Sequence, residues 1–272
     1  MTVLEAVILG VVQGATEFLP VSSSAHLVLV PEFFNIPAPT LAFDVLLHLA
    51  TLIAVVGYFF GDVRKIVLSV VAPGRMAKLE VKYWRRLLAW LIVGSIPAGL
   101  AGVLLGSYFE DLFSSTLAVG VFLVVTSLLL TGSDLAVGRV SRLPLNLERM
   151  KGADAFVVGC FQALAIAPGL SRSGSTIAGG IFLGFDRQTA ARFSFLLSIP
   201  AILGAFLINI GDISGAFGSG EGLAYLMGAV AAGVSGFIAV SFLMRFLKNH
   251  RLRLFAIYTA ALGIFVIILS LV

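Results

Sequence analysis

Early in its second half, the chain reads Pro168-Gly169-Leu170-Ser171-Arg172-Ser173-Gly174-Ser175-Thr176. Proline ends a helix and serine or threonine caps the next one, so this stretch predicts a break between two helices. A second stretch has the same design, with Pro20 followed by Ser22, Ser23 and Ser24. Each break is expected to point the free N–H groups and the positive end of its second helix into a pocket.

The chain around these breaks is too apolar for a water-soluble protein. Of its 272 residues, 59% are hydrophobic and 12% are charged, and the mean hydropathy is +1.08. Too few polar residues remain to cover a core of this size, so lipid must surround most of the chain. We therefore expect an all-α integral membrane protein, in which the net charge of +4 indicates no nucleic-acid partner.

Six apolar runs are long enough to cross about 30 Å of hydrocarbon, which takes roughly 20 helical residues. They cover residues 42–60, 87–106, 115–133, 192–210, 223–244 and 254–272. Two shorter runs, 3–19 and 154–170, end in the two breaks, and each is expected to form a re-entrant helix pair with the helix that follows. Non-helical backbone at membrane depth must be buried in protein or line a watery cavity, so both breaks predict an internal polar pocket.

The two halves of the chain match each other at an offset of 149 residues. The matching pairs include Glu5 with Asp154, Gly10 with Gly159, Gln13 with Gln162, Ser22 with Ser171, and Ser24 with Ser173. Each half holds one re-entrant pair and three spans, and because three is odd the second half enters the membrane from the opposite side. We expect one membrane domain over 1–272, with an inverted-topology repeat of about 1–135 and about 150–272.

Lysine and arginine predict the orientation of the spans. The basic segments, expected in the cytoplasm, are 61–86, 134–153 and 245–253. The segments without Lys or Arg, expected outside, are 26–41, 107–114 and 211–222. Both termini and the mouth of the pocket then face the exterior or periplasmic side.

The second break offers an anion site, because the Arg172 guanidinium matches phosphate oxygens with two parallel hydrogen bonds. The candidate phosphate-binding residues are Ser22, Ser171, Arg172, Ser173 and Thr176. Glu17 and His26 add reactive groups to the first break. A carboxylate at bilayer depth is costly unless it is paired, so Glu17 is a candidate site residue, and the alternative is an ion pair with Arg172 that pins the two halves together.

These motifs are similar to those of one known family. Gln13-x-x-x-Glu17, then Pro20-Val-Ser-Ser and His26, with Pro168-Gly-x-Ser171-Arg172-Ser173-Gly174-x-Thr176, resembles the undecaprenyl-diphosphate phosphatases of the bacitracin-resistance type. The resemblance spans the whole chain. It implies a multi-pass enzyme of the plasma or inner membrane that removes the terminal phosphate of the C55 isoprenoid diphosphate, which recycles the lipid carrier for cell-wall synthesis. The first motif position is Glu or Gln in the family, and Gln13 leaves Glu17 with the carboxylate role.

Physical roles follow from this chemistry. Arg172 and the hydroxyls are expected to hold the diphosphate, and Gln13 supports Glu17. His26 is interpreted as the direct actor, which attacks phosphorus or deprotonates Ser23 or a water while Glu17 fixes its tautomer. The alternatives stay open: His26 is a satisfied core histidine, and Ser23 is either the nucleophile or only a helix cap.

The resemblance also implies the partners and cofactors. A polyprenyl diphosphate lipid and membrane lipid are expected, and a homodimer is left open. A divalent cation, Mg²⁺ or Ca²⁺, is implied as an assistant. Only Glu17 offers a carboxylate as a metal ligand in the motifs, so the cation would depend on substrate phosphates and no tightly bound cofactor is expected.

A transporter or flippase of a phosphorylated polyprenyl lipid is the alternative function. Inverted repeats with broken helices are also the architecture of secondary transporters, and the same site would then bind without cutting. An anion channel is disfavoured, because the spans are nearly uninterrupted Leu, Val, Ile and Phe.

The charge pattern generates a prediction on topology. Cysteines introduced at Glu110 and Asp212 should react with an impermeant thiol reagent in intact cells, whereas a cysteine at Lys78 should not. Labelling of the Lys78→Cys variant alone would reverse the orientation.

Overall fold

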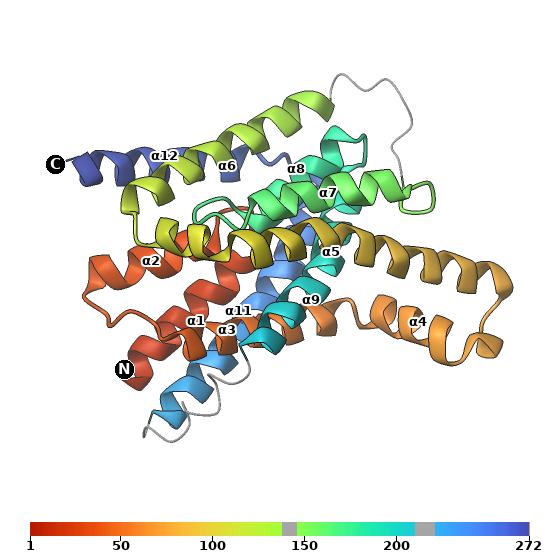
Figure 1. The fold of residues 1–272 in the computed structure, drawn as a ribbon, viewed down its shortest axis with the longest axis horizontal. Helices are drawn as coiled ribbons and strands as arrows, with labels where there is room; N and C mark the ends of the chain where they lie inside the picture. The colour runs from red at the N-terminus through yellow and green to blue at the C-terminus, as the bar shows by residue number, and fades with distance from the viewer. Residues whose placement is uncertain (138–145, 210–220, 272) are drawn as a thin grey trace.

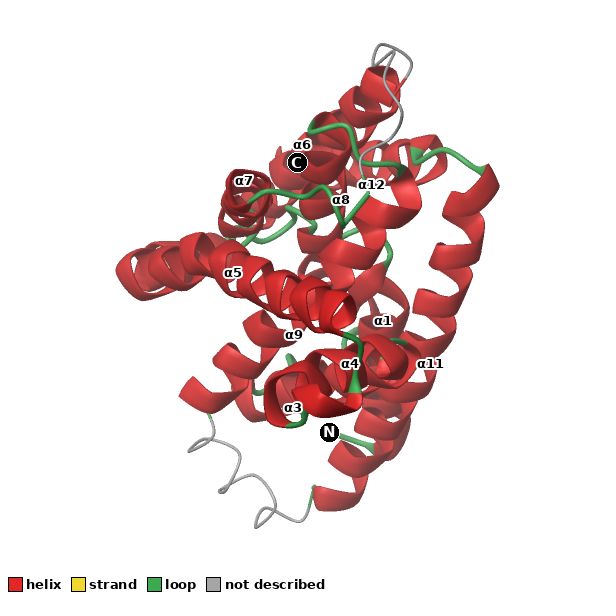
Figure 2. Cartoon of the chain, turned by 90° about the vertical axis from the view of Figure 1, so that its right-hand side faces the viewer, coloured by secondary structure: helices red, strands yellow, loops and turns green. Residues whose placement is uncertain are grey.

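The computed structural model describes residues 1–137, 146–209 and 221–271 (Figure 1). All described elements are helical, as Figure 2 shows. Within these ranges, six helices are long and apolar enough to cross a membrane: α3 (Leu41–Tyr58), α5 (Lys78–Phe113), α6 (Thr116–Val137), α9 (Arg187–Ile208), α11 (Gly222–Asn249) and α12 (Arg253–Leu271). The predicted all-α class and the six spans are confirmed.

Both predicted helix breaks are present. Helices α1 (Val3–Phe18) and α2 (Ser23–Phe34) flank the first break, and α7 (Gly152–Leu164) and α8 (Arg172–Phe182) flank the second. Ser22 and Ser171 are the N-caps, and their side chains accept hydrogen bonds from backbone N–H groups in the first turns of α2 and α8. Capping by serine is therefore confirmed at both breaks, while re-entry of each helix pair into the membrane stays a prediction.

The hydropathy pattern missed helical structure in the basic segment 61–86. Helix α4 (Phe60–Val71) lies in this segment, a 3₁₀ turn follows at Pro73–Arg75, and α5 begins at Lys78 rather than at 87. Charged residues such as Lys78 and Glu80 are good helix formers, so α5 extends beyond its apolar run. In Figure 1, α4 and the first turns of α5 lie side by side and project from the rest of the molecule.

The two chain ends lie close to the same end of the molecule, and the side of the membrane that they face stays a prediction. Figure 1 shows both termini at one end of the molecule and α4 at the other. Residues 138–145 and 210–220 lie outside the described residues, and with them parts of two predicted loops, including Asp212.

Helices cross closely at glycines in matching positions of the two halves. A Cβ atom added to Gly10 of α1 would collide with the Gly228 carbonyl of α11. In the other half, a Cβ atom on Gly159 of α7 would collide with the Gly94 carbonyl of α5. Gly10 and Gly159 are one of the pairs at the offset of 149. The helices that lead into the breaks therefore make equivalent close crossings, α1 with α11 and α7 with α5.

The core beneath the breaks is aromatic and aliphatic. Phe18, at the end of α1, and Phe195 of α9 are fully buried, and their rings meet edge to face with centroids 5.5 Å apart. Both belong to the largest buried cluster among the described residues, which reaches α8 through Ile177 and Ile181. This packing fixes the position of the end of α1, and so of the first break, against α8 and α9.

The close crossings generate a prediction on stability. Gly159→Ala should lower the melting temperature in detergent by several degrees, because overpacking against a backbone carbonyl costs about 1–3 kcal/mol. Gly99→Ala is the matched control, since apart from the backbone of α5 itself no described atom lies within 4 Å of a Cβ added to Gly99. It should keep or raise the melting temperature, because alanine is the better helix former by about 1 kcal/mol. Equal shifts in the two variants would contradict the close crossing.

Candidate functional site

Glu17 is the polar centre of the first break. Its side chain, in the last turn of α1, is only 4% exposed. Oε1 accepts a hydrogen bond from Arg172 Nη2, while Oε2 accepts from Ser23 Oγ at 2.5 Å and from Gln13 Nε2 at 3.0 Å. A buried carboxylate requires such donors, and these three come from α1, α2 and α8. The contact with Arg172 joins the two breaks directly.

Arg172 uses one edge of its guanidinium for Glu17. Its second terminal nitrogen, Nη1, is buried and has no hydrogen-bond partner among the described residues. Arg172 is also the first residue of α8, where backbone N–H groups lack helical acceptors. A planar guanidinium with a free donor beside a helix N-terminus is suited to bind an anion.

Side-chain hydrogen bonds hold the two breaks against each other. Ser173 Oγ donates to the Leu19 carbonyl at 3.0 Å, and the Gly169 N–H donates to Ser24 Oγ at 3.4 Å. Thr126 of α6 donates to the Gly169 carbonyl at 3.0 Å. The Leu19 carbonyl and both backbone groups of Gly169 are therefore bonded by side chains of other elements, as buried irregular backbone requires.

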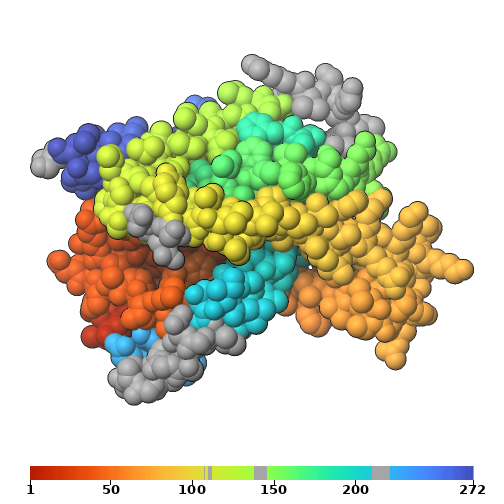
Figure 3. Space-filling view, in the orientation of Figure 1, coloured from red at the N-terminus to blue at the C-terminus, as the bar shows by residue number. Residues whose placement is uncertain are grey.

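A cavity of about 820 Å³ opens beside these groups. Its polar end is lined by Glu17, Ser22, Ser23, Ser24, Asp44, His48, Ser171 and Arg172. The rest of its wall is mostly apolar and includes Leu27, Val28, Leu41, Val45, Phe113, Ile166, Ile202 and Phe206. Figure 3 shows the surface hollowed between the orange, yellow and cyan parts of the chain, which supply this wall. One end of the cavity thus suits an anion, and the other suits an apolar chain.

Most of the predicted site residues meet at this cavity. Gln13 lies behind the wall and donates to Glu17, as its supporting role predicts. Ser173 and Thr176 are exceptions among the predicted phosphate ligands. Thr176 Oγ1 donates to the Arg172 carbonyl at 2.8 Å and lies 2.6 Å from Ser194 Oγ, and Ser173 is bonded to Leu19. Their hydroxyls hold protein groups and do not face the cavity.

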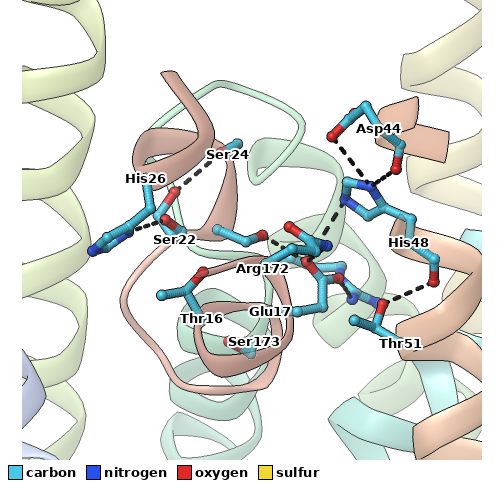
Figure 4. A network of polar contacts seen from close by, with 12 residues as sticks. Thr16, Glu17, Ser22, Ser24, His26, Asp44, His48, Thr51, Arg172 and Ser173 are labelled. Atoms are coloured by element: carbon cyan, nitrogen blue, oxygen red, sulfur yellow. Dashed lines mark hydrogen bonds and ion pairs between the residues drawn. The ribbon is translucent and has the colours of Figure 1, made fainter. Parts of the chain in front are cut away.

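The expected pairing of His26 with Glu17 is not found, and that prediction is corrected here. His26 Nδ1 lies 2.7 Å from the Ser22 carbonyl, and Nε2 lies 2.7 Å from the Tyr258 hydroxyl of α12. The two rings are stacked, with an angle of 8° between their planes. Figure 4 shows His26 pointing away from Glu17 and Arg172. Both ring nitrogens are already engaged on the far side of α2, so the imidazole does not face the cavity.

Two titratable residues that the motif argument did not assign line the cavity instead. His48 of α3 has its Nε2 3.7 Å from Glu17 Oε2 and its Nδ1 2.9 Å from the Asp44 carbonyl (Figure 4). The same Nδ1 is 3.6 Å from Asp44 Oδ1. Residues four apart share one face of a helix. The signal that could have found them is this pair of titratable residues, one turn apart, in an otherwise apolar span.

The residues of this site do not fit a resident metal. In residues 1–137, 146–209 and 221–271, no group of three or more His, Cys, Asp or Glu is arranged to hold a metal ion. The carboxylate of Glu17, the candidate ligand, is already occupied by Arg172, Ser23 and Gln13.

Comparison with known proteins identifies relatives over the full length. Residues 6–265 match the family described as bacitracin resistance protein BacA. An undecaprenyl-diphosphatase of Methanosphaera stadtmanae is 43% identical, over 100% of this chain and 99% of its own. The undecaprenyl-diphosphatases of Moorella thermoacetica and Gemmatimonas aurantiaca are each 43% identical, over 98% of this chain and 97% of their own. The similarity includes both breaks and every helix that lines the cavity.

Proposed function

The chain belongs to the family of the bacitracin resistance protein BacA, and from this membership we propose that it hydrolyses undecaprenyl diphosphate to undecaprenyl phosphate and inorganic phosphate. The observation that carries the proposal is the two-part cavity. Arg172 lines its polar end and keeps one buried nitrogen without a hydrogen-bond partner among the described residues, and the apolar wall of the cavity matches an isoprenoid chain. The relatives are named for the diphosphatase activity, so transport of the intact lipid is not favoured.

Ser23 is the nucleophile in this proposal. Its Oγ donates to Glu17 at 2.5 Å, which is the geometry of a nucleophile and its base. Oγ attacks the terminal phosphorus, Glu17 takes the hydroxyl proton, and the bond from phosphorus to the bridging oxygen breaks. Glu17 passes this proton to the departing undecaprenyl phosphate. It then accepts a proton from the water that cleaves the phosphoserine and returns it to Ser23 Oγ.

Arg172 and the helix N-termini stabilise the charge of the transferring phosphoryl group. The free edge of the guanidinium binds phosphate oxygens while the other edge keeps Glu17 in place. The first turns of α2 and α8 add backbone N–H donors. Any divalent cation is proposed to arrive with the diphosphate, because the carboxylate of Glu17 is already engaged.

His26 is a positioning residue in this proposal. Ser22 has φ 70° and ψ 95°, a region that non-glycine residues rarely occupy and that costs about 1–3 kcal/mol. The hydrogen bond from His26 Nδ1 to the Ser22 carbonyl holds this turn, and Tyr258 fixes the ring. The turn presents the next residue, Ser23, to Glu17.

The cavity is proposed to open toward the exterior side of the cell membrane. Its wall includes Ala38 and Phe113, which lie within two of the segments that hold no Lys or Arg, and Asn209, which lies next to the third. The positive-inside rule places these segments outside. The labelling experiment on Lys78 tests this orientation.

Phosphate release by the purified protein in detergent tests the proposed function. The wild type should release phosphate from undecaprenyl diphosphate. Arg172→Lys should lower kcat/KM about 100- to 1000-fold, because an ammonium group cannot hold Glu17 and two phosphate oxygens with parallel hydrogen bonds. Arg251→Lys is the matched control, since Arg251 is exposed between α11 and α12, and it should keep wild-type activity. No release by the wild type, with the lipid bound intact, would favour transport.

Variants of His26 separate positioning from direct chemistry. His26→Ala should lower kcat about 100-fold, the cost of misplacing a reacting group by about 1 Å. His26→Asn should recover much of this loss, because the asparagine amide nitrogen occupies the position of Nδ1 and can donate to Ser22. His26→Gln places its amide nitrogen nearer to Nε2 and should resemble alanine. Equal loss in all three variants, with unchanged melting temperatures, would return His26 to a direct role.

A further inference from the structure

Asp44 and His48 are not used by the mechanism above, although both line the polar end of the cavity. The His48 side chain is 31% exposed, while the Glu17 side chain beside it is 4% exposed. An ionisable residue in a spanning helix is costly unless it is paired or hydrated, and it is a functional candidate for that reason. We therefore expect His48 to contact a ligand in the cavity.

A hydrogen bond assigns a proton to Nδ1 of His48, and the nearby charge of Glu17 favours a second proton on Nε2. Nδ1 lies 2.9 Å from the Asp44 carbonyl, and a carbonyl only accepts, so Nδ1 carries a hydrogen. Nε2 faces Oε2 of Glu17, a carboxylate that accepts from Ser23 and Gln13. An unprotonated Nε2 would turn its lone pair toward this negative charge. The favourable arrangement is an imidazolium between two carboxylates.

The Nε2–H of this imidazolium forms no hydrogen bond with Glu17. The separation of 3.7 Å is within ion-pair range but is too long for a hydrogen bond. Nε2 therefore retains a donor at the cavity wall, next to the same carboxylate oxygen that Ser23 contacts. An anion placed for attack by Ser23 would lie beside this donor.

The charges on the cavity wall favour a further positive group beside the anion. Arg172 is paired with Glu17, and Asp44 adds another negative charge to the wall. A lipid diphosphate brings at least two more negative charges into this space. Helix N-termini contribute only about half a charge each. A positive side chain in addition to Arg172 would therefore strengthen the binding of the diphosphate.

We propose that His48 is a second phosphate-binding cation, whose Nε2–H donates to the substrate phosphate while Asp44 positions the ring. The inference rests on the proposed function for the identity of the anion. The binding role itself requires only a phosphate on a lipid at the polar end of the cavity.

The charged groups that face His48 come from three elements. Asp44 lies on α3 itself, Glu17 on α1 and Arg172 on α8. Helices α9 and α11 also pack on α3. The charged residues of α9, Arg187 and Arg192, lie in its N-terminal part and pair with Asp134 and Asp62, while those of α11, Arg245 and Lys248, lie near its C-terminus.

The pH dependence of KM tests the proposal. His48→Gln keeps a side-chain donor but removes the charge. At about pH 6 it should raise KM for undecaprenyl diphosphate about tenfold or more, the effect of losing a charged hydrogen bond. The ratio of the variant KM to the wild-type KM should fall as pH rises through the titration of His48, because the wild type then loses the same charge. Titration of the substrate cancels in this ratio.

Two further variants complete the kinetic experiment. Asp44→Asn removes one carboxylate from beside the imidazolium. The rise of KM with increasing pH should therefore begin at a lower pH in this variant than in the wild type. His250→Gln is the matched control at the exposed end of α11 and should leave KM unchanged. An unchanged KM in His48→Gln at about pH 6, or a KM ratio that is constant with pH, would overturn the proposal.

Binding without turnover separates this inference from the proposed function. Calorimetry with undecaprenyl phosphate should show affinity that falls with rising pH in the wild type and is weak throughout in His48→Gln. This result without any diphosphatase activity would sustain the role of His48 and overturn the proposed reaction. Normal hydrolysis with identical binding by the two proteins would overturn the role of His48 and leave the reaction standing.

Discussion

The buried ion pair between Glu17 and Arg172 joins the two helix breaks on which the site depends. Each of these charges would be costly alone at this depth, and removing one partner of a buried pair typically costs about 3–5 kcal/mol. The pair links the end of α1 to the start of α8, residues from opposite halves of the chain. The cavity, the capped helix starts and the position of Ser23 all follow from holding these two ends together.

The pair can serve both the fold and the chemistry, because each partner keeps a polar atom that the pair does not occupy. Arg172 keeps a free buried nitrogen, and Glu17 uses its second oxygen for Ser23 and Gln13. Glycine crossings bring α1 and α7 close to their neighbours, and the hydroxyls of Ser24, Thr126 and Ser173 bond the backbone of the breaks. Irregular backbone in a membrane is costly unless its polar groups are hydrogen-bonded. Here the same two breaks, once bonded in this way, present donor groups to a ligand.

The sequence predicted features that depend on local chemistry. Long apolar runs indicated the six spans, and proline followed by serine indicated the two capped breaks. The ion pair of Glu17 with Arg172 was among the alternatives, because few other partners exist for a charge at that depth. The resemblance to the family motif indicated Gln13 as a support for Glu17, and its hydrogen bond to that carboxylate agrees with this role.

Features that depend on tertiary contacts were not predictable in this way. The partner of His26 is Tyr258, 232 residues away on α12, and no local spacing reports that contact. Ser173 and Thr176 look like phosphate ligands in the motif, yet the turn directs their hydroxyls to Leu19 and Ser194. His48 was overlooked because its importance lies in facing Glu17 across α1 and α3, which hydropathy does not reveal.

The central claim is that Ser23 attacks phosphorus with Glu17 as its base, and trapping the covalent intermediate tests it most directly. Samples of the wild type would be quenched in acid and, in parallel, in base during turnover of substrate labelled in its terminal phosphate, and the labelled residue identified by mass spectrometry. The account predicts acid-stable phosphate on Ser23, and none in Ser23→Ala, which is inactive. Full activity of Ser23→Ala, or acid-labile, base-stable phosphate on His26, would contradict it.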